Sequence, residues 1–368
     1  EGVFYSSQDA DTNGEEGQTL VWKKREIEEI LGTDSEIFCI YFDVTDGGNF
    51  EGKTILANNI KRSALAFKFD KTENEISRII SEGLTKLLQI RNKRQQPGKD
   101  DKVLTAWNGL MISAFVKGYR VSGESKYLDI ALTAIDFYHK QFEKSGILHR
   151  VHKNGEFRLN AYLDDYVYLA NAVVDVFEIT GKSVYLDFAT KLSNYLIEHF
   201  WDDRKGNFFF TADNHEKLII RPKSNYDLSM PSGNSVAANV LFRLNHIVNE
   251  EKFHTVSQKI LESHATQAAE NPFAFGYLLN VIFLDIQKPT EITIINTQNL
   301  ELVSTLNKKF IPESIMVQID DKNELDMLSK LPFFAGKQFS EDKTNVFVCK
   351  NFSCSLPLTN MSDIEENL

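Results

Sequence analysis

Cysteine is scarce in this sequence, whose 368 residues include only Cys39, Cys349 and Cys354. An odd, sparse count is typical of a reducing compartment rather than of a disulfide framework. The spacing of the last two is too wide for a CxxC motif, and no second pair accompanies them. We therefore expect ordinary thiols and a cytoplasmic chain, with an organelle matrix as the alternative.

Long apolar runs and clustered cations are also missing. No run approaches the ~18 residues of a membrane span, and the first residues lack the basic and apolar regions of a signal peptide. Lys and Arg together number 41 against 52 Asp and Glu, a net charge of −11. Phosphate-rich partners require clustered cations, so we expect neither a membrane nor a nucleic-acid partner.

The signatures of several catalytic classes are absent as well. The sequence has no HExxH motif and no histidines at metal-ligand spacing, so we expect no metal site. It has no GxSxG elbow for acyl transfer. The C-terminal region has no glycine-rich phosphate loop, and we expect no cofactor.

What the sequence does contain is a repeat. Segments 123–131 and 181–189 both read Gly-x-Ser-x-Tyr-Leu-Asp-x-Ala. Each glycine suits the left-handed position that ends one helix, and a second helix starts within a few residues. The repeat therefore predicts two helical hairpins, with helices at 104–122 and 124–143, then at 161–180 and 182–200.

The hairpins continue along the chain. Residues 233–248 and 250–268 predict a third hairpin, 272–286 begins a fourth, and helix 72–94 precedes the first. Glycine-marked excursions with strand-like residues follow two of the second helices, at 146–151 and 206–211. This pattern predicts an all-α fold, an (α/α) toroid of hairpins over 1–288; a linear helical solenoid is the alternative.

The two ends of the sequence differ from this pattern. Segment 2–6 resembles segment 206–210, which follows the outer helix of a hairpin. Because no helix comes before segment 2–6 in this sequence, we expect upstream helices to be missing from this chain. Segment 289–368 alternates strand-like runs (292–295, 315–319 and 346–349) with helix-like runs (299–310 and 323–331). It is predicted to form a small C-terminal α/β unit.

The inner helices of such a ring run in the same direction, so their first residues share one rim. Two carboxyl groups can supply the acid and base of sugar chemistry, aromatic rings stack on a pyranose, and polar groups bind its hydroxyls. The candidate catalytic carboxyls are Asp164, Asp165, Asp9, Asp11, Glu15 and Glu16. The candidate substrate-binding residues are Trp107, Asn108, Tyr162, Tyr166, Arg221, Ser232 and Asn234.

A structural interpretation competes with each of these assignments. Asp or Ser at a helix start commonly caps the helix, and this applies to Asp164, Asp165 and Ser232. Trp107, in an apolar stretch, can equally be a core residue. Because polar and aromatic residues recur at the starts of three successive inner helices, the functional interpretation is favoured for the candidate residues taken together.

Several motifs together resemble the thioredoxin-domain-containing family of the spermatogenesis-associated type. They include Thr-Ala-Trp-Asn-Gly-Leu at 105–110, Leu-Asp-Asp-Tyr at 163–166 and Met-Pro-Ser-Gly-Asn-Ser at 230–235, with further segments at 4–11, 221–223 and 348–354. The resemblance implies a six-hairpin barrel similar to glycoside hydrolases and to the N-acylglucosamine 2-epimerase group. It also implies a preceding thioredoxin-like domain, which this sequence does not contain.

Two functions remain open from the sequence. The first is a carbohydrate-active barrel that cleaves a sugar by paired carboxylates, in the manner of a glycoside hydrolase. The second is a non-catalytic scaffold that binds a glycan or a protein for the absent thioredoxin-like domain. Carboxyls that face an open cleft would favour the first, and carboxyls used as helix caps would favour the second.

Overall fold

The computed structural model describes residues 2–217, 219–350 and 353–368, which form two compact units. The smaller unit is Ser7–Asp101, and the larger consists of the segment up to Ser6 and Lys102–Leu368. This division differs from the boundary expected at residue 289. The α/β tail belongs to the larger unit because its sheet shares a core with the helical hairpins.

The smaller unit is a group of helices joined to short β-hairpins. Its buried core lies between the helices and includes Trp22, Phe38, Leu65 and Ile80. Thr72 and Glu75 form a reciprocal capping box at the start of the longest helix. The helices are α1 (Lys24–Leu31), α2 (Ser35–Tyr41), α3 (Arg62–Lys68) and α4 (Glu73–Arg91). The strands are β1 (Ser7–Gln8), β2 (Asp11–Thr12), β3 (Glu15–Glu16) and β4 (Lys99–Asp100), paired β1 with β4 and β2 with β3.

The larger unit contains the predicted hairpins. They are α5 (Thr105–Ser122) with α6 (Ser125–Ser145), α7 (Leu163–Thr180) with α8 (Ser183–Phe200), and α9 (Gly233–Val248) with α10 (Glu251–Glu270), followed by η2 (Pro272–Phe275) and α11 (Gly276–Gln287). Gly123 and Gly181 end the first helices of two hairpins at φ values of 73° and 62°, and Asn249 does so in the third at 56°. The predicted fold class, an (α/α) arrangement of hairpins, is confirmed.

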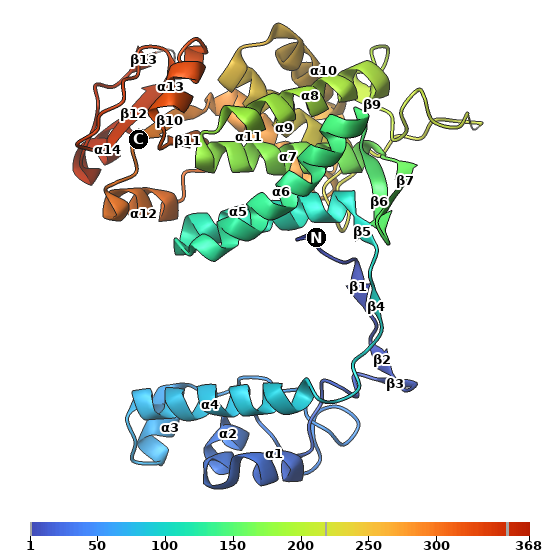
Figure 1. Cartoon of the computed structure of the whole chain (residues 1–368), viewed down its shortest axis with the longest axis vertical. Coiled ribbons are helices and arrows are strands. Elements are labelled where there is room, and N and C mark those ends of the chain that lie inside the picture. Colours follow the sequence, from blue (N-terminus) through green and yellow to red (C-terminus); the bar gives the residue numbers. More distant parts are fainter. Residues whose placement is uncertain (1, 218, 351–352) are drawn as a thin grey trace. The chain divides into compact units, whose positions relative to one another are not determined.

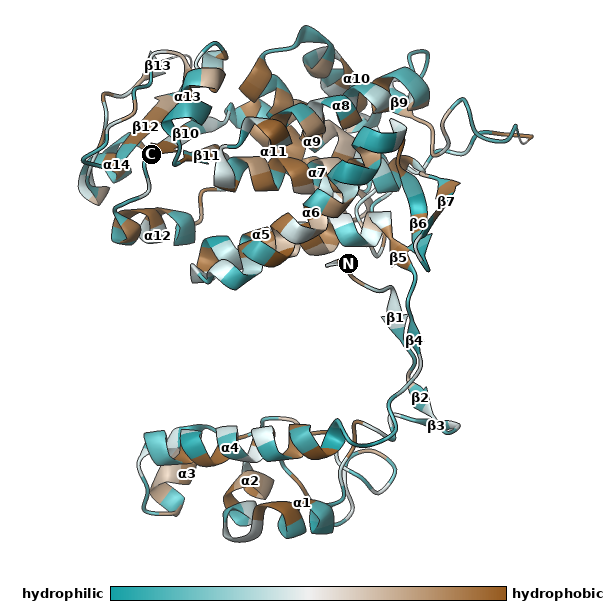
Figure 2. Ribbon diagram, in the orientation of Figure 1, coloured by the Kyte–Doolittle hydropathy of each residue, from teal (hydrophilic) through white to brown (hydrophobic). Residues whose placement is uncertain are grey.

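The inner layer of the larger unit consists of the first helix of each hairpin. Helix α7 packs against α5 and α9, and α9 packs against α11 (Figure 1). Gly109 permits the closest approach, because a Cβ there would lie 2.6 Å from the backbone of Tyr168. Apolar residues run along α7, α9 and α11 (Figure 2). Within α7 only Asp164, Asn171 and Thr180 are not fully buried.

Short strands lie before α5, between α6 and α7, and between α8 and α9. They are β5 (Val103–Leu104), β6 (His149–Lys153) and β7 (Glu156–Asn160) in one sheet, and β8 (Trp201–Asp202) with β9 (Asn207–Phe208) in another. These excursions bring loop residues to the starts of α5, α7 and α9. The candidate site of the larger unit must therefore be sought at this end of the hairpins.

The tail is a four-stranded sheet with helices, and it packs on α7. Strand β10 (Thr290–Ile295) pairs in parallel with β11 (Ser314–Ile319) and antiparallel with β12 (Asn345–Lys350), which pairs with β13 (Ser353–Cys354). Ile315, Val317 and Ile319 join the hairpin core, whereas Ile292 and Val346 belong to a separate cluster. The remaining helices are α12 (Leu300–Lys308), α13 (Lys322–Leu328), η3 (Pro332–Phe334) and α14 (Met361–Asn367).

The cysteines correct one expectation. Cys349 and Cys354 form a disulfide, whereas Cys39 is free and buried. The two disulfide partners occupy directly opposed positions on β12 and β13, so the strand register brings together thiols that the sequence spacing did not suggest as a pair. Among the described residues, no helix is both long and apolar enough to cross a membrane.

Candidate functional site

Asp165 connects the starts of two inner helices. Its Oδ1 accepts a hydrogen bond from the backbone N–H of Ala106 in α5 at 3.0 Å, and its Oδ2 accepts one from the N–H of Tyr162 at 2.9 Å. The residue is 1% exposed. Burial raises the pKa of this carboxyl to about 7, although the two N–H donors and the charge of Arg150, 3.8 Å away, act in the opposite direction. Asp165 is thus a structural junction between α5 and α7.

Asp164 lies beside it but is used differently. Its Oδ1 is buried and has no hydrogen-bond partner among the described residues. The same oxygen lies against Gly233 at the start of α9, where a Cβ would approach it to 2.6 Å. Burial raises the pKa of Asp164 to about 6, and the charge of Arg150 opposes that shift. Asp164 is therefore a carboxyl that can change protonation state near neutral pH.

Three groups that the sequence argument did not select as site residues are linked electrostatically to Asp164: Arg150 and Tyr168 directly, and Asp227 through Tyr168. The guanidinium of Arg150 lies over the ring of Tyr162 at 4.9 Å and acts electrostatically on Asp164. Burial raises the pKa of Tyr168, and the charges of Asp164 and Asp227 raise it further. Asp227 accepts hydrogen bonds from Ser232 N at 2.7 Å and from Tyr277 N at 2.8 Å. It therefore belongs to the same rim as Asp164.

A sequence signal for these groups exists in part. Tyr168 is one helical turn after Asp164, so both lie on one face of α7. Asp227 stands in the loop that leads into the third inner helix, where caps are expected. Arg150 lies on a β excursion and is brought to the site by strand pairing, which the spacing of residues along the chain does not reveal.

Asn108 and Asn234 are backbone anchors, which corrects their assignment to substrate binding. Asn108 accepts a hydrogen bond from the N–H of Phe4 at 2.8 Å and donates to the carbonyl of Phe4 at 3.0 Å. Asn234 makes the same pair with Phe208, at 2.6 and 3.2 Å. Each side chain is 1% exposed. Their polar groups are buried and satisfied, so they are not available to a ligand.

Tyr166 anchors the third excursion in a related way. Its hydroxyl accepts a hydrogen bond from the N–H of Leu148 at 3.0 Å, and the side chain is buried. Leu148 is two residues after Gly146, as Phe4 is after Gly2 and Phe208 is after Gly206. The three inner-helix starts therefore share a repeated anchor for the incoming excursion. The recurrence noted in the sequence is structural at these positions.

Arg221 and Ser232 also bind the protein itself. Arg221 donates to the carbonyls of Thr211 at 2.5 Å and His199 at 3.2 Å, and it lies over the ring of Phe209. Ser232 caps α9 by accepting from Ser235 N, and it is buried. The hydroxyl of Ser232 is enclosed in this structure, and its role in ligand binding stays a prediction.

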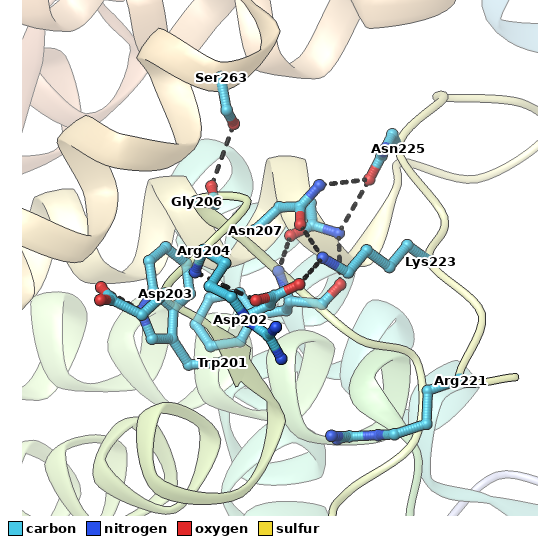
Figure 3. Close-up of polar contacts among 12 residues, drawn as sticks. Trp201, Asp202, Asp203, Arg204, Gly206, Asn207, Arg221, Lys223, Asn225 and Ser263 are labelled. Carbon is cyan, nitrogen blue, oxygen red and sulfur yellow. Dashed lines mark hydrogen bonds and ion pairs between the residues drawn. The ribbon is translucent and has the colours of Figure 1, made fainter.

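A polar network holds the loop that carries Arg221 (Figure 3). Lys223 donates to Asp202 Oδ2 at 2.6 Å and also to the amide oxygen of Asn207. Asn225 accepts from both Asn207 and Asn234, at 3.5 and 3.4 Å. In Figure 3 the side chain of Arg221 points away from this cluster. The network gives Lys223 and Asn225 a structural role in the loop before α9.

Trp107 remains available as an aromatic surface, whereas the ring of Tyr162 already packs against Arg150 and Phe210. Trp107 is 45% exposed on α5, so it is not a plain core residue. Tyr162 is half-buried and stacks on Phe210 with the ring centroids 4.9 Å apart. An exposed ring is compatible with stacking on a sugar.

The four carboxylates predicted to oppose Asp164 all belong to the smaller unit. Asp9, Asp11, Glu15 and Glu16 are exposed there, and the last three lie on the β2–β3 hairpin. Glu15 forms ion and hydrogen-bond contacts with Lys53 at 3.5 Å and Gln18 at 3.0 Å. The structure thus does not bring these groups together with Asp164 within one unit. Their catalytic role stays a prediction.

One family model matches a part of the larger unit, and curated relatives match the whole chain. The family model described as "D-glucuronyl C5-epimerase C-terminus" matches residues 105–174. Human spermatogenesis-associated protein 20 is 25% identical over 410 residues, covering 100% of this chain and 52% of that protein. An uncharacterised protein of Caenorhabditis elegans is 28% identical over 404 residues, covering 100% of this chain and 54% of that protein. The chain spans about half the length of the curated relatives it matches.

Solved structures resemble the chain loosely. Cellobiose 2-epimerase from Bacillus thermoamylovorans aligns with a TM-score of 0.38 at 12% identity, over 55% of this chain and 57% of that one. A family 76 α-mannanase from Bacteroides thetaiotaomicron aligns with a TM-score of 0.40 at 9% identity, over 77% of this chain and 82% of that one. These scores do not bear on the reaction.

Proposed function

We propose that the larger unit is a carbohydrate-active site in which Asp164 is the general acid of a glycoside hydrolase-like cleavage. The observation that carries the proposal is the Asp164 carboxyl itself, which has a buried oxygen without a partner among the described residues and a pKa raised to about 6. A general acid must hold a proton near the working pH, and burial supplies that property here.

In the proposed reaction, Asp164 gives its proton to the glycosidic oxygen. The bond from the anomeric carbon to that oxygen breaks as the oxygen of a water molecule bonds to the carbon. Asp227 accepts the proton that the water loses, because each of its oxygens retains a lone pair beyond the one N–H it accepts. Trp107 stacks on the sugar, and Arg150, held over the ring of Tyr162, binds its polar groups.

The test compares two adjacent aspartates in a screen for glycan cleavage. Asp164→Asn should abolish the release of reducing ends, with little change in melting temperature, since no backbone bond is lost. Asp165→Asn should lower stability and retain turnover at temperatures where the protein remains folded. Wild-type activity should fall about tenfold per pH unit above the pKa of Asp164, because the acid form becomes scarce. Equal turnover in Asp164→Asn and the wild type would remove the basis of this proposal.

A non-catalytic scaffold is the second candidate, and a specific observation favours it. Several predicted site residues, among them Asp165, Asn108 and Asn234, hold helices and loops together instead of facing a ligand. Binding to a glycan array that persists in Asp164→Asn, with no cleavage by the wild type, would select the scaffold.

We also propose membership of the thioredoxin-domain-containing family of the spermatogenesis-associated type. The proposal is supported by relatives that match along the whole of this chain. Co-purification of a thioredoxin-like domain with this chain would test the association.

A further inference from the structure

A cavity in the larger unit lies away from Asp164 along the same helix. Its volume is about 630 Å³, and it is lined by α5, α7, α9, α11 and the segment between α12 and β11. On α7 its lining residues are Asn171, Asp175 and Glu178, in the middle and C-terminal parts of the helix. Asp164 is at the N-terminal end of that helix. Asp164, Tyr168, Asn171, Asp175 and Glu178 follow one another at intervals of three or four residues, so their side chains lie on one face of α7.

The wall of this cavity is built on a buried ion-pair network. Arg243 of α9 donates to Asp175 Oδ1 at 2.8 Å, to Glu178 Oε1 at 3.0 Å and to Asn171 Oδ1 at 3.2 Å. The side chains of Arg243, Asp175 and Glu178 are at most 10% exposed. Charges at such positions contribute little net stability compared with apolar residues of the same size. These charged groups give the cavity a polar wall whose position is fixed by the mutual ion pairs.

Amide and hydroxyl groups extend this polar wall. Asn239 donates to Asn171 Oδ1 and to the Tyr277 hydroxyl, both at 3.1 Å. Asn280 also lines the cavity, and its side chain makes no hydrogen bond to any described residue. The oxygen of the fixed Asn239 amide and both polar groups of the exposed Asn280 amide are available to the hydroxyls of a ligand.

The entrance of the cavity is positively charged and aromatic. Arg120 is 3.6 Å from Glu178, whose other oxygen already accepts from Arg243, and Lys117 is exposed beside it. Four cations line the cavity, Lys117, Arg120, Arg243 and Lys309, against two carboxylates, Asp175 and Glu178. Lys309 is paired with Glu365 at 2.6 Å, so the excess positive charge lies at Lys117 and Arg120. The exposed rings of Phe283 and Phe310 complete the lining.

We propose that this cavity is a binding site for a small anionic, hydroxylated ligand, of the uronate or sugar-phosphate kind. The anionic group lies between Lys117 and Arg120, where one positive charge is in excess. The hydroxyls bind Asn280, Asn239 and the carboxylates of the network, and Phe283 or Phe310 covers the apolar face of the ring. The inference does not rest on the reaction proposed for Asp164.

The test is calorimetric titration of the chain with sodium D-glucuronate, glucose 6-phosphate, glucose and inorganic phosphate. Lys117→Gln/Arg120→Gln should weaken the binding of the anionic sugars about tenfold or more, because both cations are lost. Lys140→Gln, on the exposed face of α6, removes a charge elsewhere and should leave binding unchanged. Asn280→Ala should weaken every sugar, charged or neutral. Circular dichroism verifies that each variant is folded.

Each outcome decides the proposal. Binding of glucuronate alone identifies a carboxylate ligand, and binding of glucose 6-phosphate alone identifies a phosphate ligand. Absence of binding by both at about 10 mM overturns the site. Equally tight binding of inorganic phosphate, or unchanged binding in the double variant, also overturns it. Asp164→Asn should keep this binding, which separates failure here from failure of the proposed cleavage reaction.

Discussion

The carboxyl of Asp165 is subject to two opposing influences. Two backbone N–H groups and Arg150 favour its charged form, whereas nearly complete burial favours the neutral form. We regard burial as dominant, because Arg150 is itself 38% exposed and its charge is screened by solvent. The carboxyl is therefore protonated more readily in the folded protein than in the unfolded chain.

This shift predicts how stability changes with pH. The folded pKa is about 7 and the ordinary value is 3.8, so the folded state binds the extra proton between these values. The contribution of Asp165 to stability is therefore fully present at low pH and is lost as the pH rises from about 4 to about 7. Asp165→Asn places an amide NH₂ opposite a backbone N–H, which should cost about 1–3 kcal/mol at pH 4.

Urea unfolding at several pH values measures the effect. The stability difference between the wild type and Asp165→Asn should shrink as the pH rises to 8, because only the wild type pays the cost of a buried charge. Asp164→Asn is the control for the lost backbone bonds, and its own stability change levels off near pH 6, because the pKa of Asp164 is raised only to about 6. A difference that stays constant with pH would show that Asp165 is ionised throughout.

The two neighbouring aspartates also mark the limit of what could be predicted at this scale. The residue types at 163–166 indicated a helix start and a candidate acid, but either aspartate could have been the cap. The choice depends on where α5 and α9 approach, at Ala106 and Gly233. Those contacts join residues far apart in the sequence, so local patterns could not decide between Asp164 and Asp165.

At the scale of elements, the helices could be predicted because their signals are local. Gly123 and Gly181 mark helix ends, and the predicted 104–122 and 182–200 correspond to Thr105–Ser122 and Ser183–Phe200. The anchors could not be predicted in the same way, since Asn108 and Phe4 are separated by 104 residues. The polar face of α7 was missed because apolar residues dominate that helix.

The anchors lead to a prediction about the excursions. Asn234→Ala leaves the N–H and C=O of Phe208 buried without partners, which should destabilise the larger unit by about 1–3 kcal/mol. Asn108→Ala should do the same through Phe4. Amide hydrogen exchange at Phe208 should accelerate in Asn234→Ala but not in Asn108→Ala. Asn74 is exposed, so Asn74→Ala is the control for replacing an asparagine by alanine at the surface. Equal protection of Phe208 in all variants would show that Asn234 is not its anchor.

At the scale of the whole molecule, the chain has separate cores. The core that includes Phe38 and Trp22 belongs to the smaller unit, and the core that includes Phe177 belongs to the larger one. Composition suggested a boundary at residue 289, where strands replace helices. The boundary was not found there because Val317 and Ile319 of the sheet complete the hairpin core. A change of secondary structure is visible in a sequence, whereas the sharing of a core is not.

Separate cores predict separate unfolding transitions. Phe38 is fully buried, so Phe38→Ala should destabilise the smaller unit by about 3–5 kcal/mol. The three tryptophans permit the measurement, since Trp22 lies in the smaller unit and Trp107 and Trp201 lie in the larger. A Trp107→Phe/Trp201→Phe background reports the smaller unit by fluorescence, and a Trp22→Phe background reports the larger. In urea, Phe38→Ala should lower the unfolding midpoint of the smaller unit, reported by Trp22, and leave the midpoint of the larger unit unchanged. Phe177→Ala should lower the midpoint of the larger unit and leave that of the smaller unit unchanged. If both midpoints move together in both variants, the two cores unfold as one cooperative body, and the division at Asp101 has no thermodynamic meaning.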